Sequence, residues 1–156
     1  MSLRGRYFSA RDILFTNSIS AELMGDIIEN IVTVYKICPF ATNTNIYGEA
    51  SDETGKVYLP GVEISAILTR RDVSTISDDF GPDRDQQITF ALREKMCRQF
   101  NLYPDIGDLI KWNNTYFEID NPVRNQLLGG IGEKSYSILC STHYTRLSSI
   151  NIKEGE

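Results

Sequence analysis

Cysteine and histidine are scarce in this chain of 156 residues, which has three cysteines and one histidine. Their positions match no common metal-binding or catalytic motif. The three cysteines, Cys38, Cys97 and Cys140, are odd in number and widely separated, with no Cys-x-x-Cys pair among them. This spacing leaves at least one thiol unpaired and lacks the paired knuckles of a typical zinc site. It indicates three reduced and mostly buried thiols, as in an intracellular protein.

His143 is the only histidine, so any Ser-His-Asp or Cys-His arrangement must use it. A strand through Cys140 and His143 places them on opposite faces, which keeps the thiol and the imidazole apart. We therefore expect no catalytic residue, no cofactor and no metal, including zinc at the three cysteines and His143. The acidic loop expected at 77–85 lacks the ligand order of an EF-hand, which favours a solvated loop over a calcium site.

Long apolar runs and an excess of positive charge are also missing. No run approaches the ~20 residues that a membrane helix needs, and the amino terminus lacks the apolar core of a secretory signal, so we expect a cytoplasmic protein without membrane contact. The 16 basic and 21 acidic residues give a net charge of −5, which argues against broad nucleic-acid binding. Arg4, Arg6 and Arg11 precede the first acid, Asp12, so this acidic chain begins with a segment of charge +3.

What remains is the composition of an ordinary globular domain, with 41% hydrophobic and 24% charged residues. A chain of this length fits one domain and can bury roughly two thirds of its unfolded surface. We predict a flexible basic arm at 1–17, a single β-rich domain at 18–150 and a mobile tail at 151–156.

The order of elements predicts one helix and six or so short strands. Ser18 or Ser20 can begin a helix that runs to about Asn30, with Leu23, Ile27 and Ile28 on its apolar stripe. Alternating or β-branched segments predict strands, a polar stretch at 41–56 predicts a projecting loop, and a glycine-rich loop is expected at 125–133. With no βαβ alternation, the fold class is α+β, mostly β, a small antiparallel barrel or sandwich with one N-terminal helix and long projecting loops. The expected strands are 31–37, 57–59, 62–68, about 87–93, the two strands of a hairpin within 108–119, and 136–146.

The clearest local signal is this β-hairpin, which turns at Asn113 and Asn114. Asparagine tolerates positive φ, as both central residues of a type I′ turn require, and strand-forming residues flank the pair. This turn pairs Ile110 with Phe117 and Lys111 with Tyr116. It therefore places four apolar side chains on one face as the expected core anchor, namely Ile110, Trp112, Phe117 and Ile119.

The hairpin, together with the loop and strand on its C-terminal side, resembles the barrel segment of neck proteins of contractile-tailed bacteriophages. The resemblance rests on Gly107-Asp108-Leu-Ile entering the hairpin, Phe117-Glu-Ile-Asp leaving it, the loop Asn125-Gln-Leu-Leu-Gly-Gly-Ile-Gly-Glu133 and the strand Tyr136-Ser-Ile-Leu-Cys-Ser-Thr-His-Tyr-Thr-Arg146. Residues 103–146 carry it at the level of sequence, and the order of elements extends it to about 18–148.

The resemblance implies a virion structural protein and not an enzyme. Such a head-closure subunit forms a homo-oligomeric ring, expected to be a hexamer, beneath the portal and its adaptor. The ring gates the DNA exit channel, docks the tail, and lets packaged DNA pass without specific binding. The expected assembly contacts lie in exposed segments, namely Arg4, Arg6, Arg11, Leu127, Leu128 and Ile131.

Other functions use the same features. A baseplate or tail-terminator subunit would use the same barrel. An OB-like binding module would stack bases on Trp112, Tyr116 and Phe117. Those aromatic residues serve equally well as core, and Lys111 is the only nearby base among several acids, which favours the core interpretation.

Overall fold

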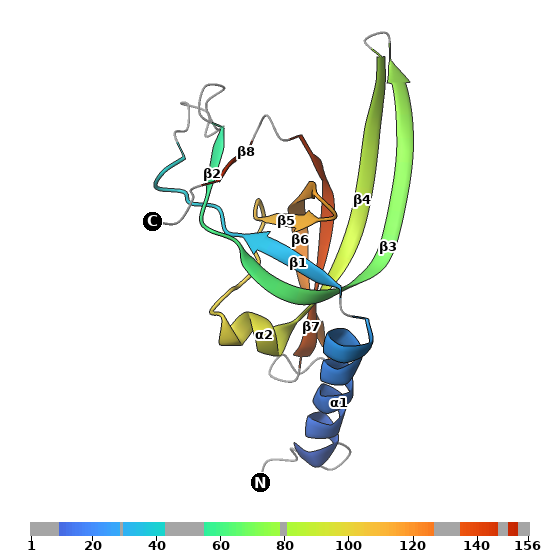
Figure 1. Cartoon of the computed structure of the whole chain (residues 1–156), viewed down its shortest axis with the longest axis vertical. Coiled ribbons are helices and arrows are strands. Elements are labelled where there is room, and N and C mark those ends of the chain that lie inside the picture. Colours follow the sequence, from blue (N-terminus) through green and yellow to red (C-terminus); the bar gives the residue numbers. More distant parts are fainter. Residues whose placement is uncertain are drawn as a thin grey trace.

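The structure, a computed structural model, is built on a closed barrel of six strands in which all neighbouring strands are antiparallel (Figure 1). The order around the barrel is β1, β3, β4, β7, β6, β5, and β5 pairs with β1 to close it. This confirms the predicted antiparallel barrel. The strands are β1 Ile31–Tyr35, β3 Val62–Asp78, β4 Gly81–Arg93, β5 Leu109–Trp112, β6 Thr115–Gln126 and β7 Ser135–Thr145. The described residues are 10–28, 30–42, 55–78, 81–126, 135–146 and 150–152.

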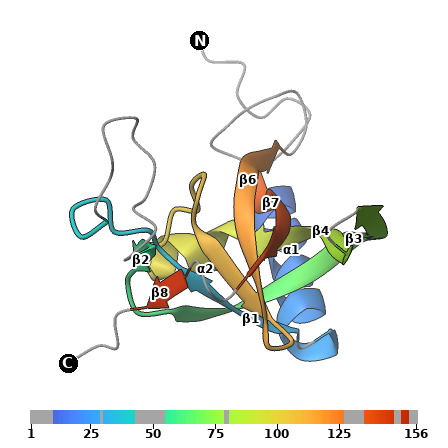
Figure 2. The same cartoon turned by 90° about the horizontal axis from the view of Figure 1, so that it is seen from above.

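Smaller elements surround the barrel. A helix, α1 (Ala10–Glu22), continues as a π-helical segment, η1 (Leu23–Ile27), and extends away from the barrel as its N-terminal appendage (Figures 1 and 2). A short helix, α2 (Glu94–Gln99), follows β4 directly. Two three-residue strands, β2 (Lys56–Tyr58) and β8 (Ile150–Ile152), form a separate parallel pair.

The barrel interior is filled by side chains that alternate along its strands. Val62, Ile64, Ala66 and Leu68 point inward as predicted: Ile64 and Ala66 are buried, and the other two pack against the core from its edge. The buried members of this core are Val32, Val34, Ile64, Ala66, Ile88, Phe90, Leu92, Cys97, Leu102, Ile110, Phe117, Ile119, Ile138 and Cys140.

The hairpin of β5 and β6 has the predicted register. Trp112 pairs with Thr115, and Ile110 pairs with Phe117. Asn113 and Asn114 have φ of 47° and 60°, as a type I′ turn requires. The predicted register of this hairpin is confirmed, because a two-residue turn fixes which residues of the two strands pair.

The predicted start of the helix was wrong. The helix begins at Ala10 and not at Ser18 or Ser20, so residues 10–17 of the expected flexible arm are helical. The prediction placed the start at a serine able to cap a helix, whereas Ser18 and Ser20 lie inside it and the residues before them show no clear apolar period. The rest of the predicted arm, 1–9, lies outside the described residues.

The predicted acidic loop at 77–85 was also wrong. Strands β3 and β4 continue through most of it, with Asp78 paired to Gly81, and they project from the barrel as a long two-stranded ribbon (Figure 1). Strand β4 pairs with β7 only from Gln87 to Arg93. Between Gln87 and the tip of the ribbon, the described residues supply no third strand. No barrel core therefore imposes apolar alternation on this part of the sequence, and a search for alternating residues does not detect it.

Two other boundaries differ from the prediction. Strand β6 runs to Gln126, into the expected glycine-rich loop, of which 127–133 lie outside the described residues. Strand β8 occupies Asn151 and Ile152 of the expected mobile tail. Its pairing with β2 joins residues about ninety positions apart, and such a partner is invisible to local patterns. The segment 43–54 of the expected projecting loop also lies outside the described residues.

Candidate functional site

Only one of the six predicted assembly contacts lies within the described residues. Arg11 is exposed on the first turn of α1. The other five positions, Arg4, Arg6, Leu127, Leu128 and Ile131, lie outside the described residues. Candidate surfaces must therefore be built from the rest of the molecule.

The four side chains predicted as core anchor lie in or against the main core. Ile110, Phe117 and Ile119 are buried, and Trp112 packs against them from the barrel edge. Phe117 meets Phe90 with ring centroids 5.9 Å apart, in an edge-on arrangement.

This packing opposes a base-stacking platform. Phe117 has no exposed surface, and Trp112 donates its Nε1–H to Asn30 Oδ1 at 3.1 Å. Tyr116 lies on the opposite face of the hairpin, with its ring centroid 6.1 Å from that of Tyr35. The three aromatic side chains therefore do not form one exposed surface for bases.

The cysteines and His143 do not come together as a nucleophilic pair. Cys140 is buried in the barrel, whereas His143 is partly exposed on the other face of β7, with Nδ1 2.7 Å from Asp120 Oδ1. Burial raises the pKa of the Cys97 thiol to about 11 and that of Cys140 to about 12. Both thiols are therefore protonated at neutral pH. Within the described ranges, no group of three or more His, Cys, Asp or Glu side chains is arranged to hold a metal ion.

A buried carboxylate organises the entrance to β5. Asp108 is fully buried, and its oxygens accept hydrogen bonds from Ile37 N at 2.9 Å, Asp105 N at 2.7 Å and Lys36 Nζ at 3.0 Å. Burial raises the pKa of Asp108, an effect that the hydrogen bonds from Ile37, Lys36 and Asp105 oppose. The carboxylate thus ties the segment before β5 to the end of β1, which is a structural task.

A second ion pair lies beside it, under the β2–β8 pair. Lys56 Nζ pairs with Glu118, and Tyr58 packs with Leu109 and Tyr35 in a small second core. Burial, followed by the nearby carboxylates of Glu118 and Asp108, raises the pKa of Tyr58. Both carboxylates have partners, Lys56 for Glu118 and Lys36 with backbone N–H groups for Asp108. Together with the packing of Tyr58, the Lys56–Glu118 pair attaches β2 to the barrel.

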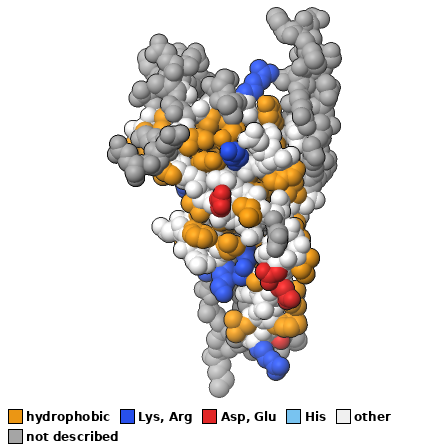
Figure 3. Space-filling view, viewed as in Figure 1, with side chains coloured by type: hydrophobic (Ala, Val, Ile, Leu, Met, Phe, Trp, Pro, Cys, Tyr) orange, Lys and Arg blue, Asp and Glu red, His pale blue; other side chains and the backbone are white. Residues whose placement is uncertain are grey.

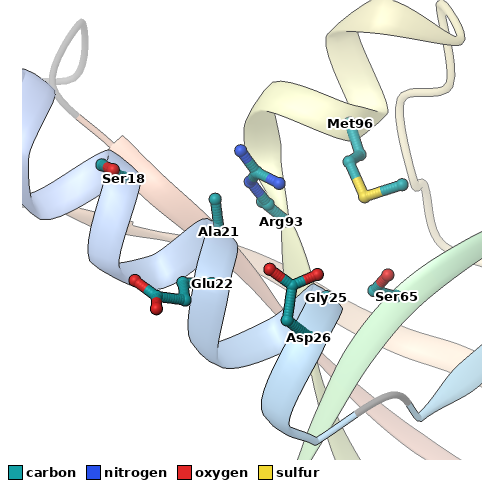
Figure 4. Close-up of a pocket in the computed structure, with 8 residues that line it drawn as sticks. All are labelled: Ser18, Ala21, Glu22, Gly25, Asp26, Ser65, Arg93 and Met96. Carbon is teal, nitrogen blue, oxygen red and sulfur yellow. The ribbon is translucent and has the colours of Figure 1, made fainter.

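A charged pocket opens where α1 and η1 meet the barrel. Its volume is about 510 Å³, and Figure 4 shows Glu22 and Asp26 on the helical side and Arg93 at the start of α2. Both signs of charge share one open cleft, and its two serines, Ser18 and Ser65, have no histidine beside them among the described lining residues. The described residues that line it are Ser18, Ala21, Glu22, Gly25, Asp26, Ser65, Arg93 and Met96.

The helical appendage exposes an apolar stripe to solvent. Phe15, Ile19, Leu23 and Ile27 recur every four residues, and all four are exposed, with 66% of Phe15 and 68% of Ile27 open to solvent. Of the predicted apolar stripe, Leu23, Ile27 and Ile28 all lie on the helical appendage, and all three are exposed.

The appendage touches the barrel through a different and narrower face. Met24 is buried, at 4% exposure, and a small apolar groove lies between it and the outer surface of β3, β4 and β7. Leu23, at the edge of the stripe, also lines this groove and is the least exposed of the four stripe residues. Figure 3 shows hydrophobic side chains along the projecting helix. Most of the stripe thus has no partner within the described part of this chain.

A second apolar surface follows α2, on the way to β5. Phe100, Tyr103 and Ile106 are all exposed, Ile106 by 66%. Exposed basic side chains precede them on α2, at Lys95 and Arg98. Sequence reasoning missed this surface because irregular segments carry no periodic signal.

The chain matches no protein-family model and no curated protein. Among solved structures it is similar to a chain in the virion of a native gene transfer agent particle, at 11% identity, with a TM-score of 0.49, over 75% of this chain and 94% of that one. It is also similar to the protein xkdH of the phage-like element PBSX from Bacillus subtilis, at 12% identity, with a TM-score of 0.39, over 72% of this chain and 92% of that one. Values this low do not assign the chain to a family.

No helix within the described residues is long and apolar enough to cross a membrane.

Proposed function

We propose that this chain is a virion structural protein of a tailed phage, a head-closure or neck subunit that acts by assembly. The observation that carries the proposal is the contrast between a complete barrel core and two projections that are little covered by the described residues. The barrel closes on itself, so it leaves no sheet edge to be covered. The projections are α1 with its exposed stripe and the β3–β4 ribbon (Figure 1).

Both projections are of a kind that gains stability from a neighbour. A helix of 13 residues is marginal in water unless an apolar face is buried, yet α1 exposes most of its large apolar side chains. An isolated two-stranded ribbon is marginal as well. Docking in a ring would bury surfaces of this type, whereas a monomeric module has no use for them.

The proposed place of the ring is beneath the portal and its adaptor, with six copies around the DNA channel and the tail below. The net charge of −5 suits that place, because a wall that repels phosphates lets the duplex slide. The sequence of the β5–β6 hairpin and of β7, which resembles phage neck proteins, supports the same position.

Complementation tests the role. Cells are infected with a phage that lacks this gene and supplied with wild-type protein, a variant lacking residues 2–9, or Leu127→Asp with Leu128→Asp. We expect both variants to fold, because a barrel core already forms from the described residues. We expect few tailed, DNA-filled particles, since an unpaired charge in an interface costs several kcal/mol. Asn113→Asp, on the exposed hairpin turn, is the matched control and should restore the full yield.

The form of the failed particles separates the candidate positions. Loss of a head-closure subunit should leave heads that have released their DNA and tails that remain unattached. A baseplate or tail-terminator subunit would instead leave filled heads with defective tails. Full particle yield in the absence of the protein would overturn the virion role altogether.

A further inference from the structure

The two exposed apolar surfaces lie on different sides of the barrel. One is the α1 stripe, defined as Phe15, Ile19, Leu23 and Ile27. The other is the α2–β5 surface, defined as Phe100, Tyr103 and Ile106. In Figures 1 and 2, α1 and the connection from α2 to β5 occupy separate sides of the barrel, so the two surfaces do not cover each other within one chain.

Exposed charges lie near the ends of both surfaces, and along each surface the positive charge comes first in the chain and the negative charge last. Along α1, Arg11 lies one turn before the stripe, and Glu22 and Asp26 lie beside its far end. Along the α2–β5 surface, Lys95 comes first and Asp105 lies near the far end. An antiparallel arrangement would therefore bring Arg11 toward Asp105, and Glu22 and Asp26 toward Lys95.

We infer that the α1 stripe of one copy of this chain packs on the α2–β5 surface of the next copy. The inference rests on the proposed function, since it specifies the contact that would build the ring. Apolar side chains would meet at the centre, and the charges at each end would have partners of opposite sign. The stripe runs roughly 18 Å along the helix, a length suited to a short apolar surface of this kind.

The contact is heterologous, because it joins two different surfaces of identical chains. Each copy then offers one free stripe and one free α2–β5 surface to its neighbours, and repetition gives a ring where the rotation closes. A contact of the stripe with itself would give only a two-fold dimer. The two arrangements predict different cross-links.

Cross-linking between two cysteine variants tests this directly. The background is the full chain with Cys38→Ser, in which the remaining cysteines are buried. One protein carries Ile19→Cys and the other Tyr103→Cys, and a bismaleimide reagent is added to each alone and to their mixture at high protein concentration. We expect linked dimers in the mixture and almost none in either protein alone.

The controls make each result decisive. Replacing Tyr103→Cys by Asn113→Cys, on the exposed hairpin turn away from the α2–β5 surface, should abolish the linked product. Dimers of the Ile19→Cys protein alone would show a helix-to-helix contact and overturn the inference. Absence of any product in the mixture would overturn it as well.

Charge reversal provides an independent test. Glu22→Lys with Asp26→Lys should weaken self-association on the order of tenfold in sedimentation velocity, because attraction to Lys95 becomes repulsion. Lys95→Glu alone should act likewise, and the combined triple variant should recover the wild-type association. If the combination associates no better than its parents, the charged ends do not face each other and the inference is wrong.

Failure of this inference is distinguishable from failure of the proposed function. If the mixed cross-link forms but particle yield is full in the absence of the protein, the contact exists and the virion role is wrong. If particles fail in the absence of the protein but the cross-link is missing, the role stands and the ring uses another surface.

Discussion

Phe117 and Lys111 occupy the two faces of one hairpin and therefore carry different shares of stability. Phe117 is fully enclosed and meets Phe90, Trp112 shields the edge of the same cluster, and Tyr144 packs on its other side. Lys111 has its Nζ 5.5 Å from the centre of the Tyr116 ring, on the opposite face of the sheet. Truncating the Phe117 side chain leaves a cavity in the core, whereas the space left by truncating Lys111 is filled by water.

Phe117→Ala should lower the free energy of unfolding by about 3–5 kcal/mol, since it removes a buried ring from a close-packed core. Lys111→Ala should lower it by less than about 1 kcal/mol, the worth of an exposed cation–π contact. Chemical denaturation monitored by Trp112 fluorescence measures both. Equal effects would show that the hairpin faces had been assigned wrongly.

Asp108 has a buried carboxylate with three hydrogen-bond donors, and an amide cannot replace it. In Asp108→Asn the NH2 group accepts no hydrogen bond, so either Ile37 N at the Oδ1 position, or both Asp105 N and Lys36 Nζ at the Oδ2 position, lose their acceptor. We expect a loss of about 1–3 kcal/mol at neutral pH. Asp105→Asn, at an exposed position, is the control and should cost much less.

The difference in stability between the wild type and Asp108→Asn should depend on pH in a defined direction. Burial raises the folded-state pKa of Asp108 above its ordinary 3.8, so in the range just above 3.8 the folded protein holds more protons than the unfolded chain. Wild-type stability relative to Asp108→Asn should therefore be greatest below 3.8, fall as pH rises through the folded pKa, and then level off. Paired denaturation curves across this range measure it, and a rising difference would contradict the assignment.

The turn between β2 and β3 is an element whose geometry depends on one glycine. A Cβ at Gly61 would lie 2.4 Å from Thr33 Cγ2 and 2.6 Å from Tyr35 Cε1, both on β1. Tyr35 belongs to the small second core and cannot withdraw freely. The chain thus passes over β1 at a distance that excludes any side chain.

Gly61→Ala should destabilise the protein by about 1–3 kcal/mol, the usual effect of overpacking. Gly25→Ala is the matched control in η1, where a Cβ meets nothing within 4 Å, and it should be neutral or gain up to about 1 kcal/mol. Thermal unfolding followed by circular dichroism compares the two. A Gly61→Ala protein as stable as wild type would contradict the close approach.

The whole barrel determines which thiols react, since strands far apart in sequence enclose two of them. Cys97 and Cys140 lie in the main core, whereas Cys38 is partly exposed after β1. Burial also keeps the two core thiols protonated, with pKa values of about 11 and about 12. Both effects slow their reaction with disulfide reagents.

A thiol-specific aromatic disulfide should modify Cys38 in the native protein within minutes and leave Cys97 and Cys140 intact. After unfolding in guanidinium chloride, all three should react. Cys38→Ser should remove the fast phase and leave the slow one, which identifies the residue. Rapid reaction of more than one thiol in the native protein would contradict a closed barrel.

The sequence alone was enough to predict an element wherever the contacts that define it are close in sequence. Asn113 and Asn114 specified the hairpin and its register, because a two-residue turn leaves a single pairing. Alternation in 62–68 and composition in 136–146 identified β3 and β7, because a barrel core imposes period two on the strands that face it. The barrel class followed from these strands and from the absence of βαβ units.

Tertiary structure decided what depends on distant partners or on which faces become covered. The α1 stripe reads as a buried face, yet the helix extends away from the barrel and the stripe stays open. The β8 strand exists only through pairing with β2, and the β3–β4 ribbon continues where no core marks its sequence. An amphipathic pattern specifies that a face can be buried, whereas the packing of the whole chain determines whether anything covers it.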